Sequence, residues 1–208
     1  MNFEFLISFV IATAALALSP GPDNIYVLMQ STVHGKTFGL ATVAGLISGC
    51  LVHTTLVAFG VSAIIKQSDT LFFVLKLFGA LYLLYLAFKV YNSNDKLDLK
   101  SDAVPKKSTG QLFKQGFIMN MLNPKVSIFF LAFFPGFLFS DTLSHVIQFY
   151  VLGLLFMLVS AIIFSTIAIL AGFISDYTMK HARVGQYLKW LQIVVFVGIA
   201  ILIFMSEN

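Results

Sequence analysis

A break inside an apolar segment of membrane-spanning length constrains this chain more than any other feature. Apolar residues run from Phe3 to Leu18 and resume at Ile25, and the sequence SPGPDN occupies positions 19–24 between them. Prolines remove backbone donors and glycine loosens a helix, and hydrocarbon offers no water to replace the lost hydrogen bonds. Such backbone survives at membrane depth only where protein buries it or it lines a polar cavity. Because Asp23 is an expensive group at that depth and functional by default, the segment predicts half of a binding site.

Several further apolar stretches of similar length indicate an all-α integral membrane protein embedded in a lipid bilayer. Of the 208 residues, 59% are hydrophobic and 11% are charged, too few polar groups for the surface of a soluble domain of this length. Runs of more than about 18 apolar residues predict transmembrane helices. The six predicted spans are Phe3–Gln30, Phe38–Ile65, Thr70–Val90, Leu112–Phe139, His145–Phe173 and Tyr187–Met205.

A polar connector, residues 92–111, divides the chain into two halves of three spans, residues 1–91 and 112–208. The connector and the loops after the first and fifth spans hold most of the lysines and arginines, whereas the opposite loops hold Lys66 alone. Basic residues gather in cytoplasmic loops, so the connector is predicted to lie in the cytoplasm and both termini outside it. The formal charge of +4 thus reflects membrane topology and does not indicate nucleic-acid binding.

The fourth span carries a second break, at Asn123-Pro124-Lys125. Three spans per half give the halves opposite orientations if they share a fold, and such inverted repeats are typical of transporters. Aligning Pro22 with Pro124 sets Asp23 opposite Lys125. The sequence therefore predicts six transmembrane helices in two inverted three-helix repeats, with helices one and four broken at a transport site.

The residues around both breaks also carry a family resemblance. They are Pro20, Gly21, Pro22, Asp23, Asn24, Gly45, Gly49, His53, Lys76, Gly79, Tyr82, Leu83, Gly116, Asn120, Asn123, Pro124, Lys125 and Pro135. With them the chain resembles the LysE/RhtB family of amino-acid exporters over essentially its whole length. The resemblance implies efflux of amino acids or close derivatives across the bacterial inner membrane, without fixing which amino acid is exported.

The opposite charges at the two breaks match an α-amino acid, which carries one charge of each sign. Asp23 is expected to bind the substrate ammonium or a coupling proton, and Lys125 to face Asp23 or the substrate carboxylate. We expect the two side chains to contact each other in the empty protein. Two structural alternatives remain: Asp23 caps the following helix, or Lys125 snorkels to an interface. The other predicted substrate-binding residues are Asn24, Asn120 and Asn123, and the predicted helix breaks are Pro20, Gly21, Pro22 and Pro124.

Gly45, Gly49 and His53 share one face of the second span because four residues separate each from the next. The glycines are expected to let another helix pack closely. His53 fits a buried core histidine and a proton carrier equally, since imidazole titrates near neutral pH. Lys76 is expected to snorkel near the end of the third span.

Other function classes lack the residues that they need. Cys50 is the only cysteine, which excludes an intramolecular disulfide or a redox thiol pair, and no enzymatic nucleophile–base set is visible. No Walker motif is present, so the proton gradient is the expected energy source, and no cofactor or metal is expected. The alternative is a divalent-cation or other small-solute transporter of the same fold, although a cation site needs several anionic or imidazole ligands and Lys125 would oppose it. The choice between a monomer and a homo-oligomer stays open.

Overall fold

The computed structural model describes residues 3–93, 106–180 and 183–205, and all regular secondary structure in these ranges is helical. Residues 94–105 of the predicted connector lie outside the described part. The α-helices are α1 (Phe3–Leu18), α2 (Pro22–His34), α3 (Lys36–Leu56), α4 (Ser62–Gln67), α5 (Asp69–Tyr91), α6 (Thr109–Leu122), α7 (Pro124–Ile128), α8 (His145–Ile169), α9 (Ala171–Lys180) and α10 (Arg183–Met205). Two π-helical turns, η1 (Val57–Val61) and η2 (Phe129–Phe133), and one 3-10 turn, η3 (Phe134–Phe137), complete the fold.

The helices confirm an all-α membrane protein. Four segments of the described chain are each long and apolar enough to cross a membrane, and two bent helix pairs bring the number of spans to as many as six. Helix α8 ends at Ile169, four residues before the predicted end of the fifth span, and α9 follows as a separate helix. Helix α10 begins at Arg183, four residues earlier than predicted.

The two bent pairs lie at the predicted breaks in helices one and four. Helices α1 and α2 meet at 58°, and α6 meets the segment that begins with α7 at 51°. Proline suits the first turn of a helix, where its missing N–H would have no helical partner. Pro22 and Pro124 accordingly begin α2 and α7, and the residues before them, Gly21 and Asn123, have extended backbone.

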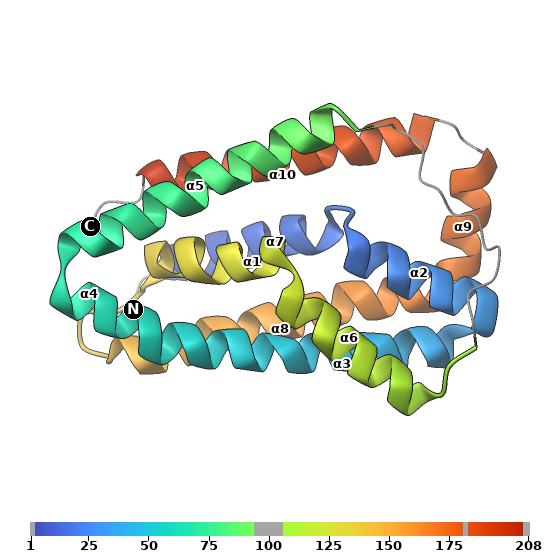
Figure 1. The fold of residues 1–208 in the computed structure, drawn as a ribbon, viewed down its shortest axis with the longest axis horizontal. Helices are drawn as coiled ribbons and strands as arrows, with labels where there is room; N and C mark the ends of the chain where they lie inside the picture. Colours follow the sequence, from blue (N-terminus) through green and yellow to red (C-terminus); the bar gives the residue numbers. More distant parts are fainter. Residues whose placement is uncertain (1–2, 94–105, 181–182, 206–208) are drawn as a thin grey trace.

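Two parts of the broken spans, α1 and α7, run through the middle of the molecule (Figure 1). Helix α5 packs against α10 on one side, and α3 packs against α8 on the other, with α1 and α7 running between these two pairs. Helix α1 begins and α10 ends at the same end of the molecule, and α2 ends near α9 at the opposite end. Both breaks therefore lie near the centre of the bundle.

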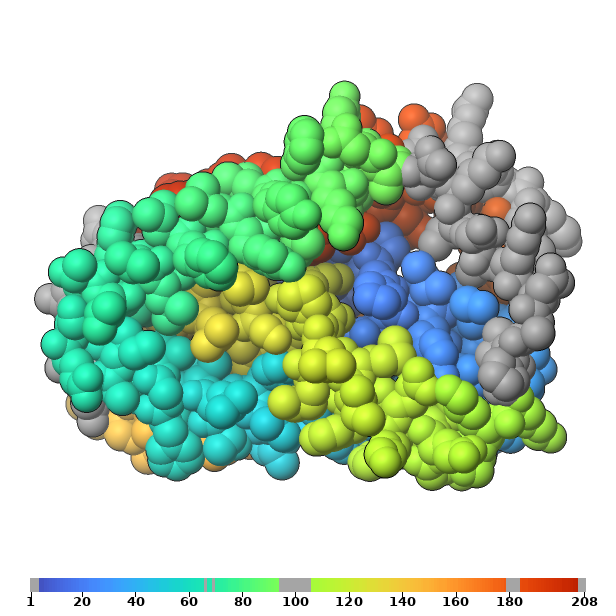
Figure 2. Space-filling model, viewed as in Figure 1, coloured from blue at the N-terminus to red at the C-terminus, as the bar shows by residue number. Residues whose placement is uncertain are grey.

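Helix α6 packs on α3 with almost no space between the backbones. A Cβ atom at Gly45 would collide with the Phe113 carbonyl, and one at Gly116 would collide with the Thr42 carbonyl. Small residues allow this close approach of membrane helices. In the space-filling view, α6 lies on the surface beside α3, and the blue atoms of α2 are visible above it (Figure 2).

A group of phenylalanines, which we call the phenylalanine core, fills the space between α1, η2, η3 and α8. Its rings stack as closely as 4.1 Å between the centroids of Phe130 and Phe134. The π turn η2 passes directly into the 3-10 turn η3, so this core surrounds the least regular part of the fourth span. Its members are Phe9, Phe129, Phe130, Phe133, Phe134, Phe137 and Phe156.

Candidate functional site

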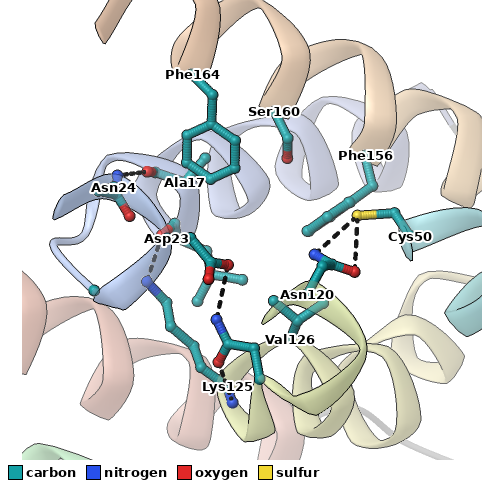
Figure 3. A pocket seen from close by; sticks show the side chains of 13 residues that line it. Ala17, Asp23, Asn24, Cys50, Asn120, Lys125, Val126, Phe156, Ser160 and Phe164 are labelled. Atoms are coloured by element: carbon teal, nitrogen blue, oxygen red, sulfur yellow. Dashed lines mark hydrogen bonds between the residues drawn. The ribbon is translucent and has the colours of Figure 1, made fainter. Parts of the chain in front are cut away.

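A small cavity lies where the two breaks meet (Figure 3). All five predicted substrate-binding residues line it. Asp23 and Asn24 come from α2, Asn120 from α6 and Lys125 from α7, and Asn123 lies between α6 and α7. The cavity volume of about 20 Å³ is enough for roughly one water molecule. The lining residues are Leu16, Ala17, Gly21, Asp23, Asn24, Cys50, Asn120, Asn123, Lys125, Val126, Phe156, Ser160 and Phe164.

Lys125 caps the end of the first half-helix from across the bundle. The last carbonyls of a helix have no partner within it, and the Lys125 Nζ donates to the carbonyls of Leu16 at 2.9 Å and Ser19 at 2.8 Å. Asn24 Nδ2 donates to the carbonyl of Ala17, which lies between these two residues, at 2.7 Å. The ammonium thereby also meets the negative end of the α1 dipole. Lys125 points into the protein, so it does not snorkel to an interface.

Asp23 presents an unpaired oxygen to the cavity. Gly21 occupies the N-cap of α2, and no side chain caps that helix, so Asp23 is not the cap that the structural alternative required. Its side chain is 5% exposed, and its Oδ2 accepts a hydrogen bond from Asn123 Nδ2 at 2.8 Å. Its Oδ1 is buried without a hydrogen-bond partner. Because a buried polar atom without a partner costs free energy, Oδ1 favours a ligand that donates to it.

Asn123 connects the two breaks. Its Oδ1 accepts from the Lys125 backbone N–H at 3.0 Å and so caps α7, while its Nδ2 holds the Asp23 carboxylate. The expected direct contact between Asp23 and Lys125 is therefore wrong. Both charges line the same cavity. Lys125, however, donates to the carbonyls at the end of α1, and Asp23 accepts from the Asn123 amide.

Asn120 forms the wall of the cavity toward α3. Its Nδ2 lies 3.4 Å from the Cys50 Sγ, and a Cβ at Gly49 would lie 2.6 Å from its Oδ1. The His53 Nε2 is 3.2 Å from the Asn120 carbonyl oxygen, a contact in which only the ring nitrogen can donate. This places His53 behind Asn120, outside the cavity lining.

Lys76 of α5 lies outside the cavity lining as well. Its side chain is buried, with Nζ 5.4 Å from the centroid of the Phe72 ring. The snorkelling that we expected of it is therefore not what the structure shows.

The wall opposite the breaks comes from α8, and our reading of the sequence missed it. Phe156, Ser160 and Phe164 line the cavity from one face of this helix. The available signal was weak: a serine in an apolar span with a phenylalanine four residues away on each side. Nothing in the sequence distinguishes that spacing from ordinary helix packing.

Comparison with known proteins supplies the family. The family model described as LysE type translocator matches residues 14–207, which include both breaks and the whole cavity. The chain belongs to this family. The resemblance drawn from the break residues is thereby confirmed, and a LysE type translocator with these helices is a multi-pass membrane transporter.

Individual relatives of this translocator are named as efflux proteins. It is 32% identical to the homoserine/homoserine lactone efflux protein of Salmonella typhimurium (strain LT2) over 171 residues, which cover 82% of each chain. The protein of the same name from Salmonella typhi has the same identity and coverage. The leucine efflux protein of Klebsiella pneumoniae subsp. pneumoniae is 28% identical over 195 residues, 93% of this chain and 92% of that protein. No solved structure matches the chain.

Proposed function

We propose that this translocator exports amino acids or close derivatives from the cytoplasm and binds them in the cavity between the two breaks. One observation carries the proposal: the cavity offers an unpaired carboxylate oxygen of Asp23 and the ammonium of Lys125. An α-amino acid carries the complementary pair of charges. Its ammonium would donate to Asp23 Oδ1, and its carboxylate would accept from Lys125. The names of the relatives, homoserine and leucine efflux proteins, support an amino-acid substrate.

Binding requires the cavity to open, because about 20 Å³ is too small for any amino acid. We propose that the described conformation is closed and that the two halves rock about the site. The contacts suit two inverted repeats: α1 packs on α8 as α6 packs on α3, and the pairs α3–α8 and α5–α10 each join one helix from each half. In transporters of this kind the site stays fixed while one repeat moves against the other.

Export would be coupled to the proton gradient through Asp23, which is the only carboxylate among the described residues that line the cavity. A proton and a substrate ammonium compete for the same Oδ1, so each would leave as the other binds. This competition exchanges an outgoing amino acid for an incoming proton. His53, behind Asn120, is the less favoured carrier. A metal cation is a poorer ligand than an amino acid because the Lys125 ammonium would repel it.

The test is efflux from cells loaded with dipeptides, which intracellular peptidases convert to single amino acids. Cells expressing the protein should release at least one amino acid several-fold faster than cells with the empty vector. Asp23→Asn should abolish the gain because the amide cannot pair with an ammonium or exchange a proton. His53→Gln should retain most of it, because the Gln side-chain amide can still donate to the Asn120 carbonyl. Wild-type cells that release every amino acid at the vector rate would contradict the proposal.

A further inference from the structure

Helix α8 turns one polar side chain toward the cavity. Phe156, Ser160 and Phe164 are four residues apart, so they lie along one face of the helix. All three point from α8 toward the side of the cavity that holds Asp23 and Asn120 (Figure 3). Ser160 thus lies between two aromatic rings and opposite the charged groups.

The Ser160 hydroxyl has no partner in the closed protein. Serine and threonine in helices can donate to the carbonyl four residues earlier. Thr54, Thr55 and Thr166 do so at 2.8–2.9 Å. Ser160 is 1% exposed, and its Oγ makes no hydrogen bond. A buried hydroxyl without a hydrogen bond is stabilised when a ligand supplies a partner for it.

The orientation of a bound amino acid directs its side chain to this wall. If Asp23 and Lys125 hold the two charged groups at the breaks, the side chain is left to face α8. The rest of that wall is apolar, with Phe156 and Phe164 on either side of the hydroxyl.

We infer that Ser160 recognises the substrate side chain and selects amino acids that carry a short hydroxylated or similarly polar side chain. The inference rests on the proposed function and adds to it the class of substrate. A site built to hydrogen-bond a substrate hydroxyl rejects an analogue without one, because the group in the site is then left buried and unpaired. The rings of Phe156 and Phe164 bound the side chain on both sides.

The test compares two substrates of nearly equal size in the Ser160→Ala variant. Homoserine ends in a hydroxyl where norvaline ends in a methyl group, and dipeptides can load cells with either. The wild type should export homoserine faster than norvaline. Ser160→Ala should lower the ratio of homoserine to norvaline export on the order of fivefold to tenfold, the loss expected for one hydrogen bond, with norvaline export kept or raised.

Thr166→Val on the same helix is the matched control. Thr166 is exposed, and its hydroxyl is already bound to the Ile162 carbonyl, so its removal should leave the ratio unchanged. An equal loss of both substrates in Ser160→Ala, or an unchanged ratio, would overturn the inference and assign Ser160 to packing. Preference of the wild type for norvaline would also overturn it while sparing the proposed function. A wild type that exports no amino acid would overturn both.

Discussion

At the scale of single residues, the site depends on how each charge meets a helix end. The Lys125 ammonium lies at the carbonyl end of α1, and the Asp23 carboxylate lies in the first turn of α2. Both placements are favourable with respect to the helix dipole. Each charge is thus stabilised without a direct ion pair, which leaves one oxygen of Asp23 available to a substrate.

Asn123 offers a test of this arrangement because its amide oxygen caps α7 and its amide nitrogen donates to Asp23. Asn123→Ala should lower the free energy of unfolding by roughly 1–3 kcal/mol, since α7 loses its cap and Asp23 loses a donor. Asn123→Ser restores a capping oxygen but cannot reach Asp23, so stability should recover in part while export stays low. Thermal unfolding in detergent and efflux in cells measure the two effects. Full recovery of export in Asn123→Ser would show that the bond to Asp23 has no role in transport.

The sequence was informative where the chemistry is local. Proline, glycine and asparagine predicted both breaks because their backbone effects act within one or two residues. The partners of Asp23 and Lys125 were not predictable, because they depend on where the Asn123 amide and the α1 carbonyls lie in three dimensions. Ser160 was missed for the same reason: its unpaired hydroxyl becomes visible only when the opposite wall is in place.

At the scale of helices, the close packing of α3 and α6 sets the position of Asn120. Gly45 and Gly116 leave room only for the facing backbone. Any added side chain must therefore separate the two helices, and Asn120, in the last turn of α6, would move with them. The cavity wall thus depends on glycines that do not line the cavity.

Gly45→Ala should accordingly destabilise the protein by about 1–3 kcal/mol, the usual cost of overpacking, and lower export. Gly198→Ala in α10 is the control, because nothing lies within 4 Å of a Cβ there and alanine favours helix over glycine. Melting temperature and efflux at matched membrane abundance are the readouts. Equal behaviour of the two variants would contradict the importance of the α3–α6 contact.

At the scale of the whole molecule, the distribution of lysines predicts which end faces the cytoplasm. Ser93, at the end of α5, and Thr142, between η3 and α8, are both exposed and lie in loops on opposite sides of the predicted membrane. The lysine distribution predicts that Ser93 is cytoplasmic.

Single cysteines at these two positions test the orientation with a membrane-impermeant thiol reagent. Thr142→Cys should react in intact cells, and Ser93→Cys only after the cells are permeabilised. Unsubstituted protein controls for Cys50, which is buried and should stay unlabelled. The reverse pattern would invert the assigned topology.

The phenylalanine core has a consequence for the cell in which the protein resides. A transporter in an energised membrane must not leak ions while it waits for cargo. The stacked rings of η2, η3 and α1 belong to a buried apolar cluster, and the cavity itself holds about one water. Apolar packing of this kind disfavours a continuous water wire, which is the usual path for stray protons. We therefore expect the empty protein to act as an electrical insulator, so that the membrane keeps its charge until a substrate arrives.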